Sequence, residues 1–139
     1  MSTRAVAVRF DERLLEQVKS FAQTRGMSTS AVVQTLVGEG IRSREIPGIQ
    51  FRQGPAGVRP SVAGGLDVWE VISQIRDLAE PSGSPAGLAG QLGLRERDVA
   101  IALEYYGRYP EEINAWIDAN EREATVARAA WAKRKALLK

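Results

Sequence analysis

Two adjacent carboxylates, Glu111 and Glu112, come closest to a catalytic pair in this 139-residue chain. They follow Pro110, and acidic residues are common in the first turn of a helix, where they face the positive end of the helix dipole. The sequence contains no histidine and no cysteine, which excludes a Ser-His-Asp triad, a thiol nucleophile and metal sites built from those residues. No Gly-Lys-Ser/Thr follows the glycines of residues 54–65, so these predict turns rather than a phosphate loop. We therefore expect no enzyme activity, no catalytic residue, no cofactor and no metal.

Charge divides the chain into three segments. The net charge of +2 comprises +2 in residues 1–45, −4 in residues 46–119 and +4 in residues 120–139. This distribution suggests separate segments with separate partners, and the alternative is a set of solvated faces on one helical protein. Neither a run of 18 apolar residues nor a secretory signal is visible, so we expect a cytoplasmic protein with no membrane contact.

Residues 4–10 alternate between two kinds of side chain, which predicts a β-strand. The side chains of one face are Val6, Val8 and Phe10, and those of the other are Ala5, Ala7 and Arg9. Asp11 is the predicted N-cap of a helix that ends at Gly26, and Ser28 begins a second helix. One strand and two helices cannot bury a core alone, and an unpaired strand needs a partner. Residues 1–45 therefore predict a homodimer or a higher even oligomer in which the apolar strand face packs onto the helices.

Residues 46–119 predict a short hairpin followed by a small helical domain. Two short runs, at residues 49–52 and 58–63, flank a turn rich in glycine. Helix starts are then expected at Asp67, at Ser84-Pro85 and at Pro110. The residues around Gly93 have the small and apolar pattern of a helix-turn-helix, with Arg95 and Arg97 at the start of its second helix. Because this segment is acidic, we expect it to contact protein rather than DNA.

The first segment resembles the ribbon-helix-helix family of DNA-binding proteins, of the Arc, MetJ and CopG type. The resemblance covers residues 3–44 and rests on the run from Val6 to Leu15, on Ala22 and on the run from Gly26 to Ser30. In that family two chains pair their strands into an antiparallel ribbon that enters the major groove. The resemblance implies DNA contacts from Thr3, Arg4, Ala5, Ala7, Arg9, Ser28, Thr29 and Ser30.

Arg9 is the strongest candidate for reading a base, because its guanidinium can bridge guanine O6 and N7. The sequence departs from the family pattern at Ala5 and Ala7, which can offer only methyl contacts. The N-terminus of the second helix, at Ser28, suits a backbone phosphate. A solvated Arg9 and an ordinary N-cap at Ser28 are the alternatives.

Residues 48–119 look like a small domain of unassigned function that is fused to VapB-type antitoxins. The matching features are Ile49-x-Phe51, Gly57, Leu66-x-Val68-x-x-Val71, Leu92-Gly93-Leu94, Val99-x-x-Ala102-Leu103-x-Tyr105-Tyr106 and Pro110-Glu111-Glu112-Ile113. The aromatic residues of this segment are expected to pack in its core.

Residues 120–139 predict a basic amphipathic helix. Its Trp131, Leu137 and Leu138 suit a groove on another protein, and packing against the chain's own middle domain is the alternative. In antitoxins of this type a C-terminal segment wraps the toxin and can send a basic side chain towards its acidic active site. The residues implied in partner binding are Arg128, Trp131, Arg134, Lys135 and Leu138.

Together these observations predict a mainly α-helical protein with a ribbon-helix-helix unit, a hairpin-plus-helical domain and a C-terminal helix. The resemblances imply the antitoxin of a type II toxin–antitoxin system, which neutralises a PIN-like ribonuclease toxin and represses its own operon by binding operator DNA as a dimer. A freestanding repressor or plasmid-maintenance regulator, in which residues 46–139 oligomerise or sense a ligand, is one alternative. A scaffold that uses its first segment only to dimerise is another.

Overall fold

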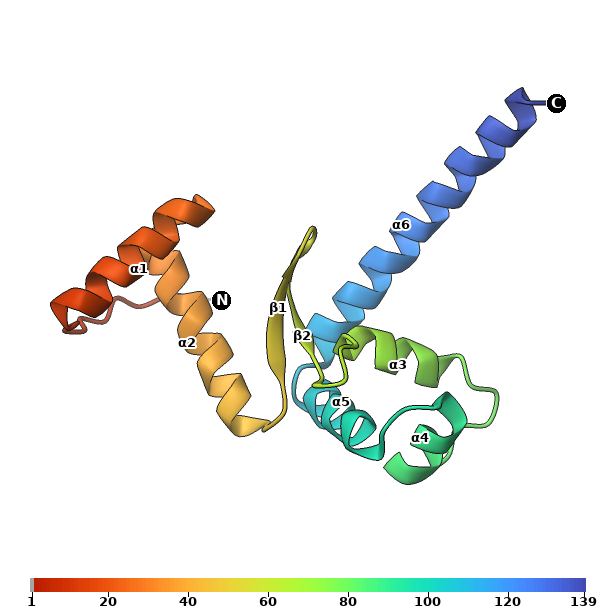
Figure 1. The fold of residues 1–139 in the computed structure, drawn as a ribbon, viewed down its shortest axis with the longest axis horizontal. Helices are drawn as coiled ribbons and strands as arrows, with labels where there is room; N and C mark the ends of the chain where they lie inside the picture. The colour runs from red at the N-terminus through yellow and green to blue at the C-terminus, as the bar shows by residue number, and fades with distance from the viewer. Residues whose placement is uncertain (1) are drawn as a thin grey trace. The chain divides into compact units, whose positions relative to one another are not determined.

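The structure is a computed structural model that describes residues 2–139, and it divides into two compact units. The first unit ends at Arg42 and the second is Ser43–Lys139. The described chain is mainly helical, with one two-stranded antiparallel sheet (Figure 1). Its elements are α1 (Glu12–Arg25), α2 (Thr29–Glu45), β1 (Gln50–Gly54), β2 (Gly57–Ser61), α3 (Val68–Arg76), α4 (Pro85–Leu92), α5 (Glu96–Arg108) and α6 (Pro110–Leu137).

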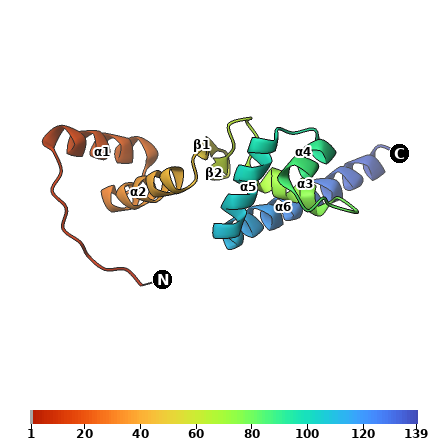
Figure 2. The same cartoon turned by 90° about the horizontal axis from the view of Figure 1, so that it is seen from below.

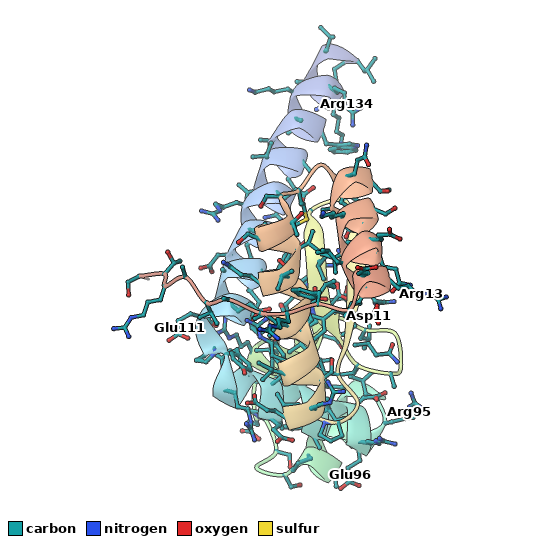
Figure 3. The ribbon with its side chains drawn as sticks, turned by 90° about the vertical axis from the view of Figure 1, so that its left-hand side faces the viewer. Asp11, Arg13, Arg95, Glu96, Glu111 and Arg134 are labelled. Atoms are coloured by element: carbon teal, nitrogen blue, oxygen red, sulfur yellow. The ribbon has the colours of Figure 1, made fainter. Side chains whose placement is uncertain are left out.

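The caps predicted for the first unit are confirmed. The Asp11 side chain accepts a hydrogen bond from the backbone N–H of Arg13 at 2.7 Å, at the start of α1 (Figure 3). Gly26 ends α1 in the left-handed conformation, with φ 63° and ψ 30°, which a residue without Cβ adopts at no steric cost. Ser28 Oγ then accepts from the N–H of Ala31 at 3.1 Å and starts α2.

The core of the first unit is very small. It consists of Val18, Ala22 and Val32, with Phe10, Phe21 and Val33 packed against them. Seven large apolar side chains of this unit stay exposed: Val6, Val8, Leu14, Met27, Leu36, Val37 and Ile41. The first unit therefore exposes more large apolar side chains than it buries.

Residues 2–10 form an extended segment that runs outside the α1–α2 pair (Figure 2). In the single chain Phe10 packs against the helices, whereas Val6 and Val8 are 80% and 65% exposed, so the packing of the apolar strand face in the homodimer stays a prediction. A β-strand is defined by hydrogen bonds to a neighbouring strand, and among residues 2–139 this segment has no neighbouring strand. The ribbon itself stays a prediction about two chains.

The second unit begins with the end of α2, so the connector predicted at residues 42–48 is shorter than expected. The predicted hairpin is confirmed: β1 pairs with β2 in a register that sets Arg52 opposite Arg59 and Gly54 opposite Gly57. Gly57 takes a φ of 123°, which closes the turn. The chain then returns so that Ser61 forms a bridge with Asp67, just before α3.

A single core joins the connector, the hairpin and three helices of the second unit. Ile46 and Ile49 of the connector are buried with residues of α3, α5 and α6, and Tyr105 is the largest fully buried side chain. The expectation that the aromatic residues pack in the core holds for Tyr105, while Tyr106 and Tyr109 pack against it partly buried. This core holds the hairpin and the first turns of α6 in fixed positions.

Helices α4 and α5 form the predicted pair around Gly93. Ser84 Oγ caps α4 by accepting from the N–H of Gly87 at 3.1 Å, and Gly93 ends it with φ 67°. Leu88 and Ala89 of α4 pack with Val99 of α5, which confirms the small and apolar contact predicted there.

Helix α6 runs without interruption from Pro110 to Leu137 and crosses the boundary expected at residue 119. Ile113 and Ile117 are buried in the core, whereas every side chain from Thr125 onwards is exposed. The C-terminal part of α6 extends beyond the other helices of its unit (Figure 1). Packing of this segment against the chain's own middle domain, one of the two interpretations of the sequence, is therefore not what the structure shows.

Candidate DNA-binding and partner-binding surfaces

The predicted DNA-binding residues lie on two elements of the first unit. Thr3, Arg4, Ala5, Ala7 and Arg9 belong to the extended segment before α1, and all five are exposed. Ser28, Thr29 and Ser30 lie at the N-terminus of α2 and are also exposed. The single chain does not gather the two groups into one site, because the extended segment runs outside the helix pair (Figure 2).

The N-terminus of α2 has the geometry of an anion-binding end of a helix. Ser28 acts as the cap, with its carbonyl accepting from Val32 at 3.0 Å and its hydroxyl accepting from Ala31. The first N–H groups of a helix have no partner within the helix, so those of Thr29 and Ser30 can point at a phosphate oxygen. The cap and the phosphate contact are compatible, since they use different groups.

An exposed apolar face lies on α2 of the first unit. On α2, Leu36, Val37 and Ile41 are 41%, 54% and 52% exposed, and Leu14 of α1 is 48% exposed. Their spacing of one, four and five residues places the α2 members on one side of the helix. Glu39 lies in the same stretch of α2, where burial raises the pKa of its carboxyl against the opposing effect of Arg42 and Arg25. This face is the surface that the predicted homodimer would bury.

The predicted partner-binding residues all lie on the exposed part of α6. Trp131 is 55% exposed and Leu138 is 86% exposed. Lys135 Nζ lies 5.0 Å from the centre of the Trp131 ring, and Arg128 donates a hydrogen bond to Thr125 Oγ1 at 3.3 Å. Arg134 projects from the last turns of the helix (Figure 3). One helix thus presents an apolar stripe and a set of cations on the same surface.

Sequence reasoning missed a buried carboxylate that joins the hairpin to α3. Asp67 was the predicted cap of α3, but its side chain makes no cap hydrogen bond. It instead accepts from Ser61 Oγ at 2.7 Å and from Arg52 Nη2 at 3.2 Å, and its other oxygen lies 3.0 Å from Arg59 Nε. Arg59 Nε is close enough for an ion pair but lacks the alignment of a hydrogen bond.

The Arg52 side chain completes this cluster. Its Nε donates to Ser61 Oγ at 3.0 Å, and it also donates to the carbonyl of Gly65. The signal that could have revealed the cluster is the register of the hairpin, because two arginines on opposite strands repel each other unless an anion lies between them. We interpret the cluster as a structural clamp.

The adjacent carboxylates of α6 have separate environments. Tyr105 donates to both oxygens of Glu112, at 3.0 and 2.9 Å, whereas Glu111 is exposed (Figure 3). The start of α5 is exposed and mixed in charge, with Arg95 Nε 3.1 Å from the buried Asp98 and Glu96 in the first turn. Among the described residues no cluster of acidic side chains is placed to hold a metal ion.

Comparison with known proteins adds no assignment. No family model, no curated protein and no solved structure matches this chain. Within residues 2–139, no helix has both the length and the apolar character needed to cross a bilayer.

Proposed function

We propose that this chain is a ribbon-helix-helix DNA-binding protein that serves as the antitoxin of a type II toxin–antitoxin pair. The observation that carries the proposal is the exposure of Val6 and Val8, at alternate positions, just ahead of a capped helix pair. Apolar side chains in that pattern are buried when a second strand and its helices cover them. Two copies would then pair residues 4–10 into an antiparallel ribbon that enters the major groove.

In this arrangement different residues would contact the DNA bases and the DNA backbone. Arg9 would lie on the outward face of the ribbon with Ala5 and Ala7, so its guanidinium bridges a guanine while the alanine methyls contact thymine. Thr3 and Arg4 would extend the contact at the end of the ribbon. The N-terminus of α2 would bind a backbone phosphate and so fix the register of the ribbon in the groove.

The exposed part of α6 supports the second half of the proposal. Trp131 and Leu138 would enter a groove on the toxin, and Arg128, Arg134 and Lys135 would face acidic groups. We propose a PIN-like ribonuclease as that toxin, because its acidic active site offers carboxylates to these cations. Neutralisation would then occur by direct binding of α6, outside the surface that contacts DNA.

The decisive experiment measures binding of the full-length protein to the DNA upstream of its own gene, across a salt series, with Arg9→Ala beside it. We expect salt-dependent binding that prefers this DNA, and we expect Arg9→Ala to lose that preference while remaining dimeric. Lys19→Ala is the matched control, since it removes one positive charge from the exposed side of α1. An Arg9→Ala protein with undiminished preference would overturn the ribbon as the reader of sequence.

A freestanding repressor is the second candidate, and the exposed stripe of α6 also favours it, because such a stripe can serve oligomerisation. The two candidates differ in what α6 recognises. An antitoxin co-purifies with a small nuclease encoded beside it and suppresses the activity of that nuclease. A freestanding repressor binds its operator equally well alone and has no effect on the neighbouring gene product.

A further inference from the structure

The exposed half of α6 carries the heptad spacing of a helix that packs against another helix. Its core-facing residues Ile113 and Ile117 are 0% and 2% exposed. The same alternation of four and three residues continues along the helix beyond the core through Asn120, Ala124, Ala127, Trp131, Arg134 and Leu138. That alternation keeps one stripe facing one partner helix over several turns. We call these six residues the α6 seam.

The composition of the α6 seam suits a closely packed partner. Ala124 and Ala127 leave room for another backbone to approach, while Trp131 and Leu138 project into the solvent with half or more of their surface exposed. A large side chain packs well where the facing helix has a small one. A second copy of α6 supplies both halves of this fit, because each copy carries the alanines and the tryptophan.

Charge decides the direction in which two copies of α6 would pair. Residues 118–123 carry three acidic side chains, Asp118, Glu121 and Glu123, and one basic side chain, Arg122. In residues 124–139 every charged side chain is basic. The helix dipole accounts for acids in the first turn and bases in the last turn, but it does not extend to Glu121 or Arg128 in the middle of the helix. Parallel pairing would set base against base, and antiparallel pairing sets the acidic stretch of one copy against the basic stretch of the other.

We propose that residues 118–138 of α6 pair antiparallel with the same segment of a second copy of this chain. In the register that sets Trp131 of each copy against Ala127 of the other, Glu121 of each copy faces Lys135 of the other. Arg128 then meets its own counterpart near the two-fold axis, as the one like-charge contact of the interface. The pairing is self-complementary, as a two-fold interface requires. It goes beyond the proposed function, and it covers the same stripe that the toxin would bind.

A charge exchange in the full-length chain tests the pairing. Glu121→Lys and Lys135→Glu each turn two attractive contacts into repulsive ones, so each weakens self-association by about tenfold at low salt, as sedimentation equilibrium measures it. The double exchange restores the association of the natural chain. Residues 121 and 135 lie about 21 Å apart along one helix at 1.5 Å per residue, so restoration requires two chains. Unchanged association in both single variants, or a double variant as weak as either one, would overturn the proposal.

Two further variants sharpen the outcome. Lys133→Glu has the same change of charge on the side of α6 away from the α6 seam, and it leaves self-association unchanged. Arg128→Ala removes the like-charge contact and strengthens self-association, whereas the proposed binding to an acidic toxin site predicts that the same change weakens neutralisation. Because self-association and neutralisation are measured separately, failure of the pairing and failure of the antitoxin proposal are distinguishable.

Discussion

Asp67 makes the clearest residue-scale prediction for stability. Its carboxylate is buried between Ser61 and the two opposed arginines of the hairpin, so Asp67→Ala leaves Arg52 and Arg59 facing each other without an anion. Removing one partner of a wholly buried pair costs roughly 3–5 kcal/mol, but both arginines here are partly exposed, so we expect about 2 kcal/mol. Unfolding in urea measures this loss.

Tryptophan fluorescence is the suitable signal, because Trp69, Trp116 and Trp131 are all in the second unit. Asp77→Ala, at an exposed aspartate after α3, is the matched control. It leaves the free energy of unfolding within about 0.5 kcal/mol of that of the natural chain. Equal midpoints for the two variants would show that the clamp contributes nothing.

Glu39 makes a residue-scale prediction about pH. Burial raises the pKa of its carboxyl in the folded chain, with Arg42 and Arg25 opposing the shift, so the folded state holds this proton to higher pH than the unfolded state does. The contribution of Glu39 to stability is therefore greatest below the unfolded pKa, and it falls as pH rises through the folded pKa. Glu39→Gln removes this dependence.

Urea unfolding followed by far-ultraviolet circular dichroism, at a series of pH values, checks the Glu39 prediction. Relative to the natural chain, Glu39→Gln gains stability as pH rises from the acid range to neutrality. Glu16→Gln, at an exposed position of α1, serves as the control for a change of net charge. If the free energy of unfolding of Glu39→Gln differed from that of the natural chain by the same amount at every pH, the raised pKa of Glu39 would not be the cause.

At the scale of elements, the sequence predicted best where local chemistry decides the structure. Asp11, Ser84 and Gly93 mark helix ends because a side-chain oxygen or a missing Cβ acts within a few residues of its own position. The hairpin was predicted in the same way, from two short strand-like runs that flank a glycine-rich turn. Asp67 is the N-cap residue of α3, as predicted, but its side chain does not make the cap hydrogen bond, because its partners Arg52 and Arg59 come from strands whose register only the folded chain establishes.

The candidate site was predictable to a different degree. The residues of the extended segment that were expected to contact DNA are exposed, as their outward positions in the alternating pattern predicted. For α6 the sequence left two interpretations open, and the structure shows exposed side chains from Thr125 onwards. The proposed strand pairing of residues 4–10 would take its hydrogen-bond partners from a second molecule, so it does not form within one chain. Both the sequence and the single-chain structure therefore leave the same apolar side chains of the extended segment and of α6 uncovered.

Removal of residues 124–139 is the element-scale prediction. Because α6 enters the core only through residues as far as Ile117, a chain that ends at Glu123 keeps the stability of its second unit within about 0.5 kcal/mol. We expect this chain to bind operator DNA and to lose neutralisation of the toxin. Fluorescence of Trp69 and Trp116 follows unfolding, and ribonuclease activity in a mixture with the toxin follows neutralisation. Full neutralisation by the shortened chain would remove α6 as the toxin-binding element.

At the scale of the whole molecule, the uncovered surface of the first unit makes its stability depend on protein concentration. A core of three buried residues cannot support two helices alone, so the folded first unit should gain its stability from a second copy. In the chain that ends at Glu123, the thermal midpoint seen by circular dichroism therefore rises with concentration, while the midpoint seen by tryptophan fluorescence does not. Ile41→Asp places a charge in the exposed apolar face and abolishes the rise, whereas Thr35→Asp, an equal change at a polar exposed position of α2, preserves it. A midpoint independent of concentration would mean that the first unit folds as a monomer, and the ribbon would then lack the second strand on which DNA recognition depends.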